Sequence, residues 1–265
     1  MTKSRAKQTK QSDLVDPDAT ARPVFVLADR HERLTSPWHA HRRAQFVHVS
    51  AGVLTVATRM ARYVVPPQRG VWVAPGVEHR IQSPTPFWLT TFYAEPDLVP
   101  DADQTRVAAV DRLTDELLIE ASSFGGDYPE AGAQARVIAV LLDRLPALET
   151  IDVVLPEPSD PRLGRLCDLL LADPAGNEPL EEVAGRVALT ERTAARLFLR
   201  DTGLTFGTWR RHMKLQAALV HLGEGANVTQ AAFAVGYADV SSFIAAFKQF
   251  FGKTPATIRA ASSTA

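Results

Sequence analysis

Three histidines in the N-terminal third of the chain have the spacing of a metal site. His39 and His41 are separated by a single residue, and His79 follows much later in the chain. Alternate side chains of a β-strand point to the same face, so we expect His39 and His41 to face the same side. His79 from a distant strand would complete a set of three imidazoles. Neutral imidazoles bind zinc, nickel, copper and ferrous iron, with a further ligand or a water completing the shell.

The same three side chains allow a second interpretation. A pocket lined by His39, His41 and His79 would also suit a small organic effector, because a neutral imidazole offers one hydrogen-bond donor and one acceptor. His31 and His48 fit neither arrangement and are expected to be structural or exposed. From the residues alone, both a metal and an organic effector remain open.

The histidines lie in a segment with the pattern of β-structure. From about Val24 to Ala94, short runs rich in Val, Phe, Tyr, Trp and Thr alternate with turn residues. Several short strands at close spacing indicate a β-sandwich or barrel. We therefore predict a sensor barrel over residues 23–100. Residues 1–22 are expected to be a disordered basic tail, because no apolar stretch follows their first lysines and arginines.

This region resembles the cupin fold. His39, His41, Gln45 and Gly52 follow the spacing of the first cupin motif, with Gln45 where that family usually has glutamate. Pro75-Gly76 and His79 follow the second motif with one residue shifted. The resemblance implies a metal held by His39, His41 and His79, with Gln45 as a fourth ligand. An uncharged Gln45 lowers the affinity for hard cations and weakens an enzymatic interpretation.

After Pro100 the pattern becomes helical. Apolar residues at steps of three and four predict one helix from about Gln104 to Ala121 and another from about Ala131 to Leu145. We expect residues 101–153 to be a helical linker that forms a homodimer through the apolar stripe of the first helix. That stripe could alternatively pack on its own barrel. Three prolines predict a stiff linker over residues 154–161.

Residues 162–259 form an all-helical segment with an internal repeat. The apolar pattern that begins at Leu180 recurs 48 positions later at Val228. Each copy has the shape of a helix-turn-helix, with a short helix, a tight turn, an N-cap candidate and a second helix. Thr190 and Asp239 are the expected caps, since their side chains can accept a hydrogen bond from a free backbone N–H of the following helix.

These residues resemble the AraC/XylS family of bacterial transcription regulators. The most specific part of the match is the string Gly236-Tyr237, Phe243, Phe247, Phe251-Gly252 and Pro255. The resemblance implies two recognition helices that enter successive major-groove segments on one face of DNA, about 34 Å apart. A longer helix, expected over about Thr205–Leu222, would hold the two motifs apart.

In the first recognition helix, the resemblance assigns DNA contacts to Arg192 and Arg196. An arginine side chain is suited to bidentate contact with guanine O6 and N7. Arg192, at the N-terminal end of the helix, could instead contact a phosphate. We expect base contacts from this helix to carry most of the specificity.

In the second recognition helix, the matching positions are Val240, Ser241 and Ala245. Valine and alanine can pack on a thymine methyl but cannot read guanine. Lys248 and Lys253 are candidates for phosphate contacts or ordinary surface lysines. The second motif is therefore expected to anchor the backbone of DNA more than to read its bases.

Charge and cysteine content agree with this division. Between Arg186 and Arg259, ten Lys and Arg residues stand against four Asp and Glu, although the whole chain has a net charge of −1. A basic unit on an acidic remainder suggests that one end meets a polyanion. The single cysteine, Cys167, excludes an intramolecular disulfide and fits a reducing cytoplasm. No apolar run approaches the roughly 18 residues of a membrane span.

The sequence thus predicts an α+β protein with a cupin-like β-barrel, a helical linker and an all-α domain with two helix-turn-helix motifs. We expect a cytoplasmic, ligand- or metal-responsive regulator that binds promoter DNA as a homodimer and contacts RNA polymerase. The alternative is a cupin metalloenzyme fused to a DNA-binding domain. Against an enzyme, the chain has neither a glycine-rich phosphate loop nor a nucleophile elbow.

Overall fold

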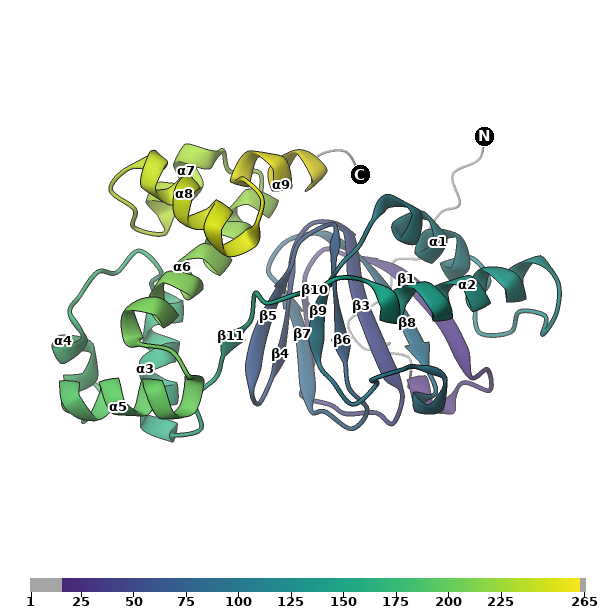
Figure 1. Cartoon of the computed structure of the whole chain (residues 1–265), viewed down its shortest axis with the longest axis horizontal. Coiled ribbons are helices and arrows are strands. Elements are labelled where there is room, and N and C mark those ends of the chain that lie inside the picture. The colour runs from purple at the N-terminus through teal and green to yellow at the C-terminus, as the bar shows by residue number, and fades with distance from the viewer. Residues whose placement is uncertain (1–15, 263–265) are drawn as a thin grey trace. The chain divides into compact units, whose positions relative to one another are not determined.

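The computed structural model describes residues 16–262, which group into two compact units. One unit holds residues 16–58 and Val65–Asp152, and the other holds Arg59–Val64 and Val153–Ala260. The first unit is rich in β-strands and the second is helical (Figure 1), which confirms the predicted α+β class. Within the described range, no helix is both long enough and apolar enough to cross a membrane.

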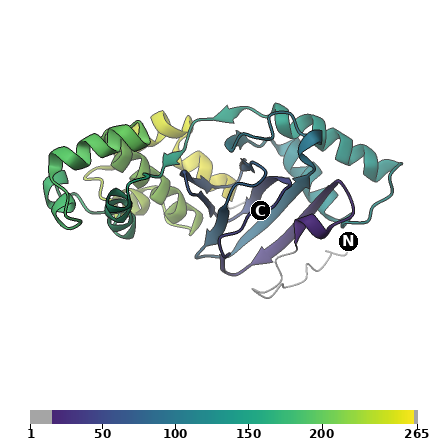
Figure 2. The same cartoon turned by 90° about the horizontal axis from the view of Figure 1, so that it is seen from below.

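The larger sheet of the first unit has six antiparallel strands in the order β1-β8-β3-β6-β9-β10. Its strands are β1 Val24–His31, β8 Phe87–Ala94, β3 Ala44–Ala51, β6 Arg69–Val73, β9 Arg106–Ala109 and β10 Thr150–Ile151. The purple strand β1 forms one edge of this sheet (Figure 2). A second set of strands consists of β4 Leu54–Thr58, β7 His79–Ser83 and β2 Leu34–Thr35, with β7 pairing to both others.

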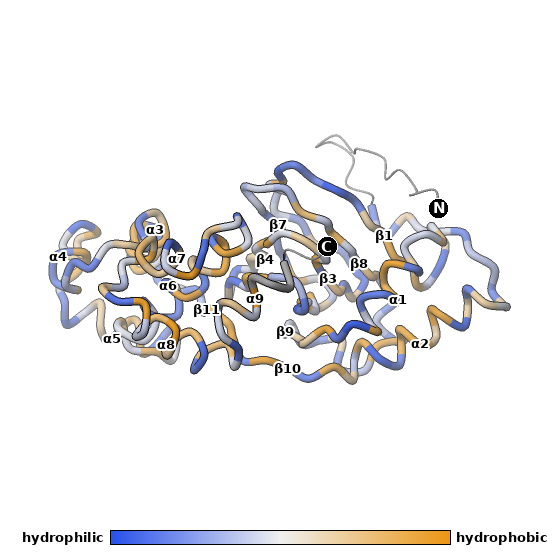
Figure 3. The backbone as a smooth tube through the Cα atoms, turned by 90° about the horizontal axis from the view of Figure 1, so that it is seen from above, coloured by the Kyte–Doolittle hydropathy of each residue, from blue (hydrophilic) through white to orange (hydrophobic). Residues whose placement is uncertain are grey.

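Two helices pack on the larger sheet. They are α1 Arg112–Ser122 and α2 Ala133–Ala147, along which hydrophobic and hydrophilic residues alternate (Figure 3). Leu118 of α1 and Leu141 of α2 share a core with Phe46, Trp72 and Phe92 of the sheet. The apolar stripe of α1 therefore covers its own sheet, the alternative that the sequence left open for this helix.

The segment 101–153 contains strands as well as helices, which the sequence prediction missed. Residues 106–109 form β9, which pairs with β6, and the helix expected from Gln104 begins only at Arg112. Asp111 starts this helix, because its side chain accepts a hydrogen bond from the N–H of Thr114 at 2.8 Å. Strand β10 then pairs with β9 and extends the sheet.

Residues 1–15 of the predicted basic tail lie outside the described residues, but residues 16–22 belong to the first unit. They include a short 3-10 helix, η1 Pro17–Ala19, in which Pro17 is buried. The buried guanidinium of Arg43 donates to the carbonyl oxygens of Thr20 at 2.8 Å and Arg22 at 2.8 Å. A second 3-10 helix, η2 Pro96–Leu98, follows the last strand of the predicted barrel segment.

The second unit contains seven helices within the described residues. They are α3 Pro161–Ala172, α4 Leu180–Gly185, α5 Glu191–Thr202, α6 Phe206–Gly223, α7 Val228–Ala234, α8 Val240–Phe251 and α9 Pro255–Ser262. Leu166, Ala184, Phe198, Trp209 and Met213 contribute to one core that spans α3 to α6. The rings of Phe243, Phe247 and Phe251, tilted against one another, fill the inner side of α8.

The proline-rich segment 154–161 is part of the second unit. Its strand β11 Leu155–Pro156 pairs with β5 Ala61–Val65, and the Glu157 N–H donates to the Met60 carbonyl at 2.7 Å. The Trp209 indole donates to the Pro156 carbonyl at 2.8 Å. Since proline cannot donate backbone hydrogen bonds, this segment is held mainly through its carbonyls and neighbouring N–H groups.

Candidate effector site and nucleic-acid interface

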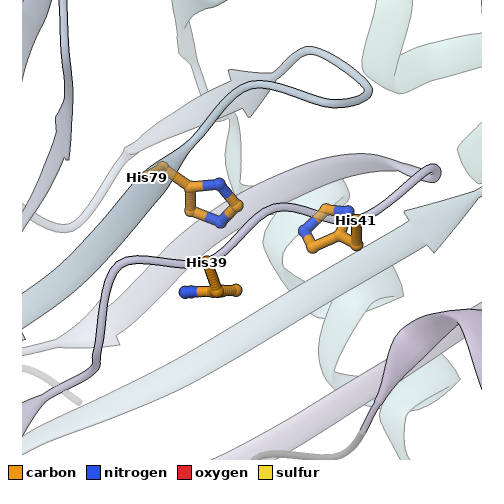
Figure 4. A group of neighbouring side chains, drawn as sticks. All are labelled: His39, His41 and His79. Carbon is orange, nitrogen blue, oxygen red and sulfur yellow. The ribbon is translucent and has the colours of Figure 1, made fainter.

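The structure brings His39, His41 and His79 together in the first unit. One nitrogen of each ring lies within 4.8 Å of the corresponding nitrogens of the other two (Figure 4). His41 and His79 are buried, whereas His39 is half-buried. The ring centroids of His39 and His79 are 4.3 Å apart, and those of His41 and His79 are 5.1 Å apart. The three imidazoles therefore share one site.

A backbone bridge, and not the continuous strand that we predicted, positions His39. The His39 N–H donates to His79 O at 3.0 Å, and the His79 N–H donates to His39 O at 2.9 Å. Pairing with β7 continues past β2 only to Ser36, whose N–H donates to Ile81 O at 2.9 Å, and resumes at this bridge, since the intervening Pro37 has no N–H. On the other side, the N–H of Gly76 donates to the carbonyl of His41 at 2.8 Å.

Backbone carbonyls hold one nitrogen of each ring. The three contacts are His39 Nδ1 to Pro37 O at 3.0 Å, His41 Nδ1 to Arg43 O at 2.9 Å and His79 Nδ1 to Val77 O at 2.8 Å. A carbonyl oxygen only accepts, so each Nδ1 carries the proton and each Nε2 of a neutral ring keeps its lone pair. Metal-ligating histidines in proteins have this arrangement, in which the second nitrogen donates to a carbonyl.

Burial keeps the two inner rings neutral. It lowers the pKa of His79 to about 4, and it also lowers the pKa of His41. Among the described residues, the buried Nε2 of His79 has no hydrogen-bond partner. A buried lone pair without a partner is rare in proteins and fits a site for a cation or another ligand.

Gln45 and Tyr93 lie beside the cluster. The Gln45 amide oxygen is 3.3 Å from His41 Nε2, and its amide nitrogen donates to the Tyr93 hydroxyl at 3.0 Å. In this orientation the lone pairs of Gln45 and of a neutral His41 face each other. Sequence reasoning missed Tyr93, because it lies near the end of β8 in a strand rich in aromatic residues and belongs to neither cupin motif.

The remaining histidines of the first unit lie outside the cluster. His48 is buried in β3 and links the sheet to α1, since its Nε2 lies 2.9 Å from Asp115 Oδ1. The ring of His31 stacks on Phe87 with centroids 5.3 Å apart. Both have structural roles, as the sequence predicted.

The helical unit contains the two predicted helix-turn-helix motifs. In each turn one residue has a positive φ, 57° at Ala188 and 75° at Gly236, at equivalent positions of the repeat. The first recognition helix, α5, is capped by Thr190, whose hydroxyl accepts from the N–H of Thr193. The second, α8, is capped by Asp239, whose carboxylate accepts from the N–H of Ser242. Both predicted caps are confirmed.

The DNA-contact candidates lie on the outer sides of these helices. Arg192 and Arg196 are exposed and one helical turn apart on α5, and no ion pair holds either of them among the described residues. On α8, Ser241, Ala245 and Lys248 are exposed and Val240 is half-buried. Lys253, after α8, is also exposed. The inner sides of the same helices are occupied by core residues.

Comparison with known proteins places this architecture in a family. A model of an AraC-like ligand binding domain matches residues 23–184, and a helix-turn-helix domain model matches residues 162–261. The HTH-type transcriptional regulator NimR of Escherichia coli (strain K12) is 32% identical over 232 residues, which cover 88% of this chain and 85% of NimR. The chain belongs to the AraC family of transcriptional regulators.

Two further similarities were found for this AraC-family chain. The HTH-type transcriptional regulator RipA of Corynebacterium glutamicum is 32% identical over 102 residues, covering 38% of this chain and 31% of RipA. The solved structure of unsaturated fatty acid bound ToxT from Vibrio cholerae shares 12% identity, covers 91% of this chain and 96% of ToxT, and gives a TM-score of 0.41.

Membership of the AraC family decides between the two functions that the sequence left open. The protein is a ligand-responsive, DNA-binding transcriptional regulator, and the family is one of regulators and not of enzymes. The thiol of Cys167 is buried, and burial raises its pKa and keeps it protonated. Its place is in the core of the helical unit, among leucines.

The neutral state of His79 predicts that the metal-free protein loses stability in mild acid. An unfolded imidazole takes up a proton near pH 6.5, whereas folded His79 stays neutral down to about pH 4. Between these values the unfolded state binds more protons, so the free energy of unfolding falls as the pH falls, by about 2–3 kcal/mol from this group. Urea denaturation at pH 7.5, 5.5 and 4.5 measures it. A His79→Gln variant should show a flatter dependence, and an equally steep one would contradict this reasoning.

Proposed function

We propose that this AraC-family regulator responds to a divalent transition metal held by His39, His41 and His79. The observation that carries the proposal is that one ring nitrogen of each histidine lies within 4.8 Å of those of the other two, while the Nδ1 of every ring contacts a backbone carbonyl and leaves Nε2 available. Neutral imidazoles suit zinc, nickel, copper or ferrous iron. The orphaned Nε2 of His79 gives the same indication.

Gln45 is the fourth ligand in this proposal. Its amide oxygen lies on the same side of His41 as the Nε2 lone pair, and a cation between them would remove the unfavourable contact. If the amide were turned over, its nitrogen would instead donate to His41 and its oxygen would accept from Tyr93. The bound ion would add positive charge to a buried site and fix the positions of β7 and the His39 segment.

A small organic effector is the second candidate ligand. The AraC-like ligand binding domain match supports a ligand without naming its chemistry. The Tyr93 hydroxyl, the Gln45 amide and the three imidazoles together would suit a polar molecule. In that case the same residues would donate and accept hydrogen bonds instead of coordinating an ion.

Metal analysis of the full chain distinguishes the two ligands. After incubation with zinc, nickel, copper or iron and removal of free metal, we expect about one equivalent per chain of at least one of them. Chelation should lower the melting temperature, because a ligand of the folded state stabilises it by mass action. A protein that stays metal-free with all four ions would overturn the metal and favour the organic effector.

We further propose that α5 and α8 enter successive major-groove segments, with Arg192 and Arg196 reading bases. Val240 and Ala245 offer only apolar contacts and Ser241 a short hydroxyl, whereas Lys248 is placed to contact a phosphate. Selection from a randomised duplex library should then give sharp base preferences in one segment and weak ones about 10 bp away. Equally sharp preferences in both segments would contradict this division.

The proposed regulator acts in the cytoplasm as a homodimer and contacts RNA polymerase at its promoters. Exposed apolar side chains on the helices of the sensor unit, Leu113, Ile119 and Val140, support the dimer. They remain uncovered after the rest of α1 and α2 has packed on the sheet. Sedimentation of the full chain over a range of concentrations tests this part of the proposal.

A further inference from the structure

A buried lysine lies at the centre of the DNA-binding unit. Lys214 of α6 has only 6% of its surface exposed. Its ammonium donates to the Asn177 side-chain oxygen at 2.9 Å and to the Ala175 carbonyl at 3.4 Å. Burying an ammonium group is unfavourable unless hydrogen bonds compensate, and an apolar side chain would fill the space with less desolvation. Directional hydrogen bonds, and not packing alone, therefore fix the position of the Lys214 ammonium group.

The loop that accepts these bonds lies between α3 and α4 and contacts the second helix-turn-helix motif. Asn177 lies two residues before Pro179, the N-cap of α4 in the first motif, and its amide nitrogen donates to the carbonyl of Gly236 at 3.3 Å. Gly236 forms the turn of the second motif. A Cβ atom there would lie 2.3 Å from the Ala175 carbonyl and 2.9 Å from Lys214 Nζ. The turn of one motif thus rests directly on the loop that leads into the other.

Two arginines tie the same loop to α6 and to the first motif. The Arg210 guanidinium, one turn before Lys214 on α6, donates to the Glu178 carbonyl at 2.7 Å. The Glu178 carboxylate pairs with Arg186, at the C-terminal end of α4, at 3.3 Å. Burial lowers the pKa of Lys214, and the neighbouring charge of Arg210 acts in the same direction. The Lys214 ammonium therefore lies where three elements meet: α6, which carries it, the loop that accepts its hydrogen bonds, and the Gly236 turn beside it.

We propose that Lys214 is a positioning residue that fixes α5 and α8 relative to each other and thereby sets the spacing between the two DNA segments that the protein accepts. Lys214 does not contact DNA itself, because it is buried. Inserting one base pair rotates the second segment by about 34° relative to the first, so a rigid pair of helices should discriminate against it. This inference rests on the proposed docking of both recognition helices.

The test measures binding of the full chain to one selected operator and to versions with one or two base pairs inserted or removed between its segments. For the natural chain we expect the two-base-pair insertion to weaken binding about 5-fold, because it turns the groove away from α8 and removes the weak base contacts of the second segment. In Lys214→Met and Asn177→Ala the same insertion should cost less than about 2-fold. Arg211→Met, which removes a charge from the exposed side of α6, should at most weaken all sites equally.

Each outcome decides the proposal. Flatter spacing profiles in Lys214→Met and Asn177→Ala, with melting temperatures near that of the natural chain, support it. Profiles parallel to that of the natural chain, including a uniform loss of affinity, overturn it. If Lys214→Met fails to fold, the exposed Asn177→Ala variant decides alone. If the natural chain itself is insensitive to spacing, the rigid pairing of α5 and α8 is wrong and the inference is overturned, whereas failure of the proposed docking would show as no base preference at all in the second segment.

Discussion

His41→Ala should bind its divalent metal at least about 100-fold more weakly than the natural chain, because even outer partners of metal ligands contribute factors of 10–100. His41 supplies the Nε2 between His79 and Gln45, and its ring is fixed by the Arg43 carbonyl. Removing it leaves two imidazoles, one of them half-buried. Isothermal titration of the metal into the full chain, with zinc, nickel and copper in turn, measures the loss.

The matched control is His31→Ala, which removes an imidazole of the same unit that stacks on Phe87 and does not face the cluster. It should retain metal binding. Circular dichroism should show that the helical unit stays folded in both variants. Metal binding by His41→Ala that equals that of the His31→Ala control would place the ion elsewhere and overturn the three-histidine site.

Arg196→Ala should weaken binding to the selected operator by about 1–3 kcal/mol, roughly 10- to 100-fold, and relax base choice at one position. Arg196 is exposed on α5, one turn after Arg192, and no acidic side chain among the described residues holds its guanidinium. If the Arg196 guanidinium reads guanine, its removal costs the complex two hydrogen bonds to that base. A phosphate contact would be lost equally from every sequence.

Competition with single-base variants of the operator separates these two outcomes. The loss should be concentrated on the preferred base, and the salt dependence of binding should change little for a base contact. Lys248→Ala is the matched control on α8, where the expected phosphate contact predicts a uniform loss and a smaller salt slope. An equal loss on every sequence for Arg196→Ala would assign Arg196 to the backbone of DNA.

Local chemistry allowed much of the helical unit to be predicted. Thr190 and Asp239 cap helices through side chains a few residues away, and the repeat places Ala188 and Gly236 at equivalent turns. Contacts between neighbours in the chain leave their pattern in the sequence, because the partners lie within one or two turns of helix. The histidine spacing was sufficient to find the cluster, although not the bridge that holds it.

Contacts between distant segments could not be predicted in the same way. Val107 and Val110 have the spacing of a helix, yet residues 106–109 pair with β6, because a sheet edge offers backbone partners that no local pattern records. Lys214 has the appearance of an ordinary helix residue in sequence. Its partners, Asn177 and the Gly236 turn, lie far away in the chain on either side.

The most direct test of the proposed function is the affinity of the full chain for its selected operator with and without metal. For the natural chain, we expect the ion that binds the histidine cluster to change this affinity at least about 5-fold, within the usual range of coupling between two sites. His41→Ala should show one affinity in both conditions. An operator affinity that metal leaves unchanged in the natural chain, or changes equally in His41→Ala, would contradict a metal-responsive regulator.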